Sequence, residues 1–209
     1  MRIRIAKLAD AGQLAEIHRC CSAAQPGGFM YQLGESFLAE YYRILLAEKY
    51  SVVLCAEDDS RQLMGFASGT LEAEEHFSTL RRSTHRLLLA CWPTLLQHPN
   101  LIRQLSSRRR SITSPGEEEN YVVTSGPRGE YWAWLPNRPK GLGGAIDLYR
   151  QWLELMKLLG APYILIEVDA INPRVEKMHL LMGATRLKEF HTADGRQRAV
   201  LKYNFLIDR

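Results

Sequence analysis

The feature that most constrains this chain is a long amphipathic segment enclosed by strand-like segments in its C-terminal half. Residues 142–159 place apolar side chains at helical spacing, and Gly160 follows at the position where helices commonly end. The apolar positions are Ile146, Tyr149, Trp152, Leu153, Met156 and Leu159. Strand patterns precede and follow this predicted helix, at 130–135 and 163–168. Such an order of strand, turn, helix and strand is typical of α/β folds.

Strand and helix patterns also alternate through the rest of the chain. The other predicted strands are 2–6, 51–57, 63–70, 121–124, 184–191 and 196–205, and the other predicted helices start after Asp10, at Glu35 and at Pro173. A further helical, arginine-rich pattern, interrupted by Pro93 and Pro99, covers about 76–110. This alternation supports an α/β class for the whole chain.

Composition narrows the class of protein. The chain has 209 residues, 46% hydrophobic and 24% charged, which is unlike a disordered chain. No stretch reaches the roughly 18 apolar residues of a spanning helix, and residues 1–6 contain no apolar run typical of a signal peptide. The cysteines at 20, 21, 55 and 91 lack metal-binding spacing. We expect a cytoplasmic protein with reduced thiols and no bound metal.

A glycine-rich turn joins the strand 130–135 to the long helix. It reads Arg138-Pro139-Lys140-Gly141-Leu142-Gly143-Gly144-Ala145. Backbone N–H groups at the positive end of a helix suit a diphosphate, glycines permit a close approach, and the two basic side chains add charge. The spacing matches neither a Walker turn nor a dinucleotide-binding fingerprint. Glycine and proline also gather at strand-to-helix turns for structural reasons, so the turn alone does not decide between the two roles.

A second pattern lies downstream of this turn, and together they carry a resemblance. After the apolar strand 163–168 comes Asn172-Pro173-Arg174-Val175-Glu176-Lys177-Met178-His179-Leu180-Leu181-Met182-Gly183-Ala184. The Arg-x-x-Gly-x-Gly of the turn resembles the acyl-CoA pyrophosphate motif of the GCN5-related N-acetyltransferase (GNAT) family. The second pattern is similar to a family signature in which an Asn opens a helix. The element order is also similar, except at about 73–120.

The resemblance implies a fold and a reaction. The fold is a mixed, mostly antiparallel sheet of six to seven strands, with a V-shaped splay between two parallel strands and helices on both faces. Residues 1–209 would form a single domain with a helical basic insertion at about 73–120. The reaction is the transfer of an acetyl group from acetyl-CoA to an amine by direct attack, without an acyl-enzyme and without a metal.

The resemblance also implies a set of site residues. Backbone N–H groups near Trp134 and Leu135 would bind the pantetheine arm and polarise the thioester carbonyl. The residues expected to bind acetyl-CoA are Trp134, Leu135, Arg138, Pro139, Lys140, Gly141, Leu142, Gly143, Gly144 and Asn172. Glu130 is the first candidate for the general base, with Glu72, Glu74, Glu75 and His76 as alternatives.

The chain departs from the family pattern at three positions. Where the family often has a tyrosine acid, seven residues after the Asn, this chain has His179. Histidine can donate a proton near neutral pH, so His179 is the candidate acid; a packed helix residue with solvent as the proton donor is the alternative. Ala184 replaces the usual aromatic residue, and Pro136 lies one position nearer the arginine than is common.

The sequence allows several interpretations of the role of the basic insertion and of the identity of the acceptor. A helical hairpin with a solvated basic face is the plainest interpretation of 77–110. Its arginines could instead hold an anionic acceptor such as a nucleotide-linked amino sugar, as in the acetyltransferases of surface-polysaccharide assembly that this region resembles. Peripheral contact with an anionic membrane is a further reading, a homodimer is allowed, and nucleic-acid binding is not expected. The competing functions are a non-catalytic acyl-CoA sensor and an acetyltransferase for protein amines.

Overall fold

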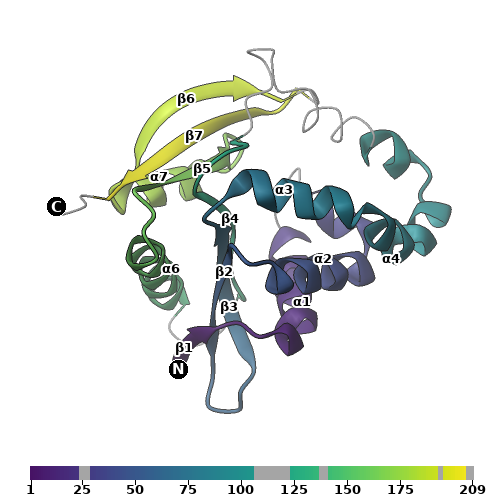
Figure 1. The fold of residues 1–209 in the computed structure, drawn as a ribbon, viewed down its shortest axis with the longest axis horizontal. Coiled ribbons are helices and arrows are strands. Elements are labelled where there is room, and N and C mark those ends of the chain that lie inside the picture. The colour runs from purple at the N-terminus through teal and green to yellow at the C-terminus, as the bar shows by residue number, and fades with distance from the viewer. Residues whose placement is uncertain (24–28, 106–122, 137–140, 193–194, 206–209) are drawn as a thin grey trace.

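The computed structural model describes residues 1–23, 29–105, 123–136, 141–192 and 195–205 (Figure 1). Its described strands form one seven-stranded sheet in the order β1-β2-β3-β4-β5-β7-β6. The strands are β1 (Arg2–Ile5), β2 (Ser51–Glu57), β3 (Leu63–Thr70), β4 (Arg128–Trp134), β5 (Tyr163–Asp169), β6 (Thr185–His191) and β7 (Gln197–Asn204). Every neighbouring pair is antiparallel except β4 and β5, which run parallel. The expected mixed, mostly antiparallel sheet is confirmed.

Helices cover both faces of the sheet, as expected (Figure 1). They are α1 (Ala11–Ala23), α2 (Glu35–Ala47), α3 (Ala73–Arg82), α4 (Thr84–Gln97), α6 (Gly141–Leu158) and α7 (Pro173–Leu181), with short 3-10 turns η1 (Leu8–Asp10) and η2 (Met30–Leu33). On one face α1, α2 and α4 share a core with Phe66 of β3. On the other face Trp152 of α6 is fully buried and donates a hydrogen bond to the Val52 carbonyl oxygen at 3.0 Å.

The sheet opens between its two parallel strands. Among the described residues, Arg128 and Leu165 are the one pair in register between β4 and β5, supported by a hydrogen bond from the Leu165 N–H to the Pro127 oxygen at 3.1 Å. β3 and β7 pair with the outer edges of β4 and β5 over most of their length. The two inner edges are therefore left unpaired beyond the first residue of β4.

A β-bulge in β4 changes the direction of one side chain. Ser68 pairs with Tyr131 while the next residue of β3, Gly69, pairs with Gly129, so Glu130 is an extra residue on β4. Gly129 faces α6: an added Cβ would lie 3.6 Å from Trp152 and Tyr149 of that helix, and 2.6 Å from Ile166 of β5. Because a bulge re-aims its residues, Glu130 turns toward α3, the direction in which Arg128 also points.

Two expectations about elements need correction. Pro93 was expected to interrupt a helix but lies inside α4, on its exposed side, where the carbonyl that loses its hydrogen bond can face water. Val123 and Thr124, expected in a strand, are not in one, and the first half of that prediction, 121–122, lies outside the described residues. So do the arginine run 108–110 and the loop 111–120. No helix in the described ranges is long and apolar enough to cross a membrane.

Candidate functional site

The opening between β4 and β5 holds a cavity of about 220 Å³. Its walls come from β4, β5, α6, α7 and β7, so it joins segments that are far apart in the sequence. The lining residues that bear on chemistry are Glu130, Tyr131, Asn172, His179 and Arg198. The candidate base, the candidate acid and the Asn of the second motif thus meet in one place.

Glu130 is held between two basic side chains. Its Oε1 accepts a hydrogen bond from Arg128 Nε at 2.8 Å and lies 3.9 Å from His76 Nε2. The side chain is 13% exposed. The other carboxylates considered, Glu72, Glu74 and Glu75, are exposed on or next to the first turn of α3 and do not line the cavity.

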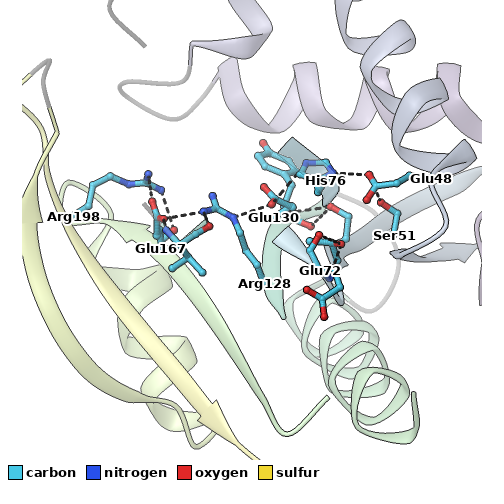
Figure 2. Close-up of polar contacts among 12 residues, drawn as sticks. Glu48, Ser51, Glu72, His76, Arg128, Glu130, Glu167 and Arg198 are labelled. Atoms are coloured by element: carbon cyan, nitrogen blue, oxygen red, sulfur yellow. Dashed lines mark hydrogen bonds and ion pairs between the residues drawn. The ribbon is translucent and has the colours of Figure 1, made fainter. Parts of the chain in front are cut away.

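Glu130 belongs to a row of alternating charges that runs from Glu48, at the end of α2, to Arg198 of β7 (Figure 2). His76 Nδ1 contacts Glu48 Oε2 at 2.7 Å, on one side of Glu130. On the other side, Arg128 Nη1 donates to Glu167 Oε1 at 2.9 Å, and Arg198 Nη1 donates to Glu167 Oε2 at 2.8 Å. Glu48 and Glu167 are nearly inaccessible to solvent, at 4% and 1% side-chain exposure. Buried charges require such partners, because an unpaired one costs several kcal/mol.

His76 is the titratable member of this row. Burial by itself lowers the pKa of His76, but the hydrogen bond to Glu48 and the charges of Glu130 and Glu48 outweigh it, so the net pKa is raised above 6.5; the positive charge of Arg128 opposes this. A protonated His76 makes the row neutral, with three acidic and three basic groups: Glu48, Glu130 and Glu167 against His76, Arg128 and Arg198.

His179 lies in the cavity in a different environment. It is 4% exposed, its Nδ1 is 2.8 Å from the Tyr203 hydroxyl, and its ring makes edge contacts with Trp132 and Tyr149. Burial lowers the pKa of His179 to about 4. The imidazole is therefore neutral at pH 7, which argues against an imidazolium as the resting proton donor.

The amides of β4 differ in their availability. The Leu135 N–H donates to the Met64 oxygen at 2.8 Å, so this amide is used by the sheet and the expectation that it contacts a ligand is corrected. In an antiparallel ladder, the N–H groups of successive residues point alternately toward and away from the partner strand. Trp134 precedes Leu135 and is in register with Gly65 of β3. The Trp134 N–H therefore points to the other edge of β4, toward the opening.

The start of α6 is open around its glycines. Gly141 begins the helix with φ +45°, a region that favours glycine, and a Cβ added at Gly141 or Gly143 would meet no described residue within 4 Å. Leu142 is exposed and Gly144 is buried. Arg138, Pro139 and Lys140 lie outside the described residues. Among the described residues, none therefore crowds Gly141 or Gly143 beside the first N–H groups of this 18-residue helix.

Asn172 starts α7, as the second motif implies. It is the N-cap residue, its carbonyl oxygen accepts from the Val175 N–H at 3.1 Å, and its side chain makes no capping hydrogen bond. In the described part of the chain no group of three His, Cys, Asp or Glu side chains could hold a metal ion.

Sequence reasoning missed much of the charge row. Glu167 interrupts the apolar strand 163–168, which is a signal for a buried charge, but nothing in the sequence names Arg128 and Arg198 as its partners. Glu48 gave no signal, because it lies among ordinary polar residues at the end of α2.

Comparison with known proteins decides the fold. No protein-family model matches the sequence, and no curated protein matches it. Among solved structures, aminoglycoside 6'-acetyltransferase type Ii is 12% identical with a TM-score of 0.60, and the match covers 100% of this chain and 99% of that one. The ribosomal-protein-S18-alanine N-acetyltransferase of Escherichia coli is 11% identical with a TM-score of 0.58, over 100% and 96%. This chain has the GNAT fold.

Another solved structure with the GNAT fold is yncA from Salmonella typhimurium, described with its cofactor acetyl-CoA. It is 13% identical with a TM-score of 0.58, and the match covers 100% of this chain and 95% of that one. At such identities the likeness concerns the GNAT fold itself, and the residue roles in this chain have to be argued from its own cavity.

Proposed function

We propose that this chain is an N-acetyltransferase that moves an acetyl group from acetyl-CoA to a primary amine. The observation that carries the proposal is the opening between β4 and β5, in which Glu130 and His179 line one cavity and the strand β4 leads toward the open N-terminus of α6. A fold alone hosts many functions, whereas this combination of cavity, carboxylate and helix start supports acetyl transfer in particular.

Acetyl-CoA fits the residues around the opening. The N–H groups at the start of α6, next to Gly141 and Gly143, are suited to its diphosphate, and Arg138 and Lys140 would add charge. The Trp134 N–H would bind the pantetheine arm, and the side chain of Asn172, free of a capping role, would bind farther along the cavity. Pro139, Leu142 and Gly144 would shape the turn. When bound, acetyl-CoA supplies an activated thioester.

Glu130 is proposed to receive the acceptor amine. An ammonium group entering the cavity would pair with its carboxylate, which accepts the proton directly or through a water molecule. Arg128 and His76 hold Oε1 from the opposite side and fix the orientation of the group. His76 is therefore proposed as a positioning residue.

His179 is proposed to assist the leaving thiolate as a neutral group. The Tyr203 hydroxyl lies 2.8 Å from Nδ1 and 3.4 Å from the His179 carbonyl oxygen. The proposed role requires the tautomer in which this hydroxyl donates to Nδ1, the ring carries its proton on Nε2, and Nε2 donates a hydrogen bond to the sulfur. This changes the expected role from a charged acid to a neutral hydrogen-bond donor, because burial keeps the imidazole unprotonated at pH 7.

The acceptor is proposed to be a small amine, and the first candidates are an amino sugar and a nucleotide-linked amino sugar. The support is the concentration of arginines in 77–110, which suits a phosphate-bearing acceptor.

We further propose one domain, with 73–120 as its insertion, in a cytoplasmic protein. A non-catalytic sensor remains the second candidate, favoured by the absence of a charged acid at position 179.

Thiol release with acetyl-CoA tests the proposal against amino sugars, nucleotide-linked amino sugars, polyamines and peptides. Release with one acceptor class, and an acetylated product detected by mass spectrometry, is the expected outcome. His179→Phe should lower kcat by about tenfold to a hundredfold while His179→Asn, which can still donate, loses less. Binding of acetyl-CoA without release for any amine would favour the sensor, and no binding would contradict both.

A further inference from the structure

The helix α4 carries a stripe of exposed apolar side chains. Leu89, Trp92 and Leu96 are 74%, 59% and 64% exposed and follow one another at helical spacing. Leu88 extends the stripe on α4, and Ile102, 53% exposed, lies shortly after the helix. We call these five residues the α4 patch. Neighbouring exposed apolar side chains in such number mark an interaction surface more often than an ordinary surface.

The opposite side of α4 explains why the patch faces outward. Cys91 and Leu95 are buried and belong to the same core as α1 and α2. The helix thus has an apolar inner side that packs and a second apolar side that does not. α4 lies at one end of the molecule, at the right in Figure 1.

Arginine is the prevailing charged residue in the described sequence next to the α4 patch. From residue 76 to residue 105 the sequence contains four arginines and no Asp or Glu. Arg81 and Arg82, exposed at the end of α3, lie directly before α4, and exposed Arg103 follows it. Two of these arginines have acidic neighbours: Arg86, on α4 itself, pairs with Glu40 at 2.7 Å, and the exposed Arg82 lies 3.9 Å from the exposed Glu75. An apolar stripe with a Trp, bordered by arginines, has the chemistry of a helix that lies in the headgroup region of an anionic bilayer.

Other occupants fit this surface less well. A symmetric dimer through the α4 patch would bring the same arginines face to face without acidic partners from this segment, which is unfavourable. A nucleic acid would satisfy the arginines but leave Leu89 and Leu96 against phosphate and sugar. We propose that the α4 patch docks this protein on anionic lipid surfaces, with the apolar stripe inserted among the headgroups and the arginines paired with lipid phosphates.

Flotation with lipid vesicles tests the proposal on the full chain, independently of acetyl transfer. Vesicles of equal parts phosphatidylcholine and phosphatidylglycerol should bind the protein, pure phosphatidylcholine vesicles should not, and high salt should weaken the binding. Leu89→Ser with Leu96→Ser should reduce the bound fraction by about tenfold or more. Arg81→Ser with Arg82→Ser should also reduce it.

The matched control is Leu158→Ser, because Leu158 is 82% exposed at the end of α6, away from the patch. This variant should bind as the native chain does, and thermal unfolding checks that all variants fold. Three results would overturn the proposal: no binding of the native chain to anionic vesicles, equal loss in the control, or a dimer in sedimentation that Leu89→Ser with Leu96→Ser dissociates while leaving vesicle binding unchanged.

Discussion

At the scale of single residues, the proposed chemistry depends on Glu130. Glu130→Gln keeps the size of the side chain but removes the group proposed to take the proton, so kcat should fall by about a hundredfold to ten-thousandfold. Acetyl-CoA binding, measured by calorimetry, should stay within about threefold, since the diphosphate and pantetheine contacts lie elsewhere. Glu72→Gln, an exposed glutamate nearby, is the control and should retain activity. Unchanged turnover in Glu130→Gln would remove this residue from the chemistry.

The contribution of His76 to the stability of the folded protein should depend on pH. Its folded-state pKa is raised above 6.5 by Glu48 and Glu130, so its contribution is fully present below pH 6.5 and is lost as the pH rises through the folded value. The free energy of unfolding of the native chain should therefore exceed that of His76→Gln most at low pH, with the difference shrinking above pH 6.5. Urea unfolding from pH 5.5 to 9 measures it. A difference that grows with pH would show that His76 is neutral in the folded protein.

At the scale of elements, a substitution at the start of α6 should change the stability of the helix and the binding of acetyl-CoA in different directions. Gly143→Asp places a negative charge in the first turn of a helix, where it is favourable by about 0.3–1 kcal/mol, and its Cβ would meet no residue of the described ranges within 4 Å. The folded protein should therefore be as stable as the native chain or more stable. Acetyl-CoA should bind at least about tenfold more weakly, because the carboxylate repels the diphosphate.

Gly143→Ala is the companion variant for that measurement. It adds a Cβ in open space and removes glycine from a helix, which should stabilise the chain by about 0.5–1 kcal/mol. Calorimetry with acetyl-CoA should find a smaller loss than for Gly143→Asp. Equal affinities for the native chain and Gly143→Asp would mean that the diphosphate does not bind at this helix.

The elements also show what the sequence could and could not predict. Long periodic or apolar segments were placed correctly: α6 follows the stripe through Trp152, and β2 and β3 match the predicted strands 51–57 and 63–70. Those patterns record the burial of side chains, which can be read from a short stretch of sequence. The bulge at Glu130, the pairing of Glu167 with two arginines and the neutral state of His179 each depend on contacts between distant segments. The prediction for Pro93 was wrong because the backbone carbonyl that loses its helical hydrogen bond lies on the exposed side of α4 and can bind water instead.

At the scale of the whole molecule, the row of charges connects the two sides of the opening. Arg128 of β4 contacts both Glu130 on its own strand and Glu167 on β5, at the point where the strands last pair. Losing its guanidinium would leave two buried carboxylates without a shared partner, which typically costs about 3–5 kcal/mol. The row therefore holds the closed end of the opening together while its other end stays free to take a ligand.

Hydrogen exchange with and without acetyl-CoA tests whether the opening between β4 and β5 and the start of α6 bind this ligand. We expect slower exchange at the Trp134 amide and at the first amides of α6, including Leu142 and Gly143, while the amides of β1 and β2 keep their rates. Protection confined to other segments, or no change with saturating acetyl-CoA, would contradict this expectation.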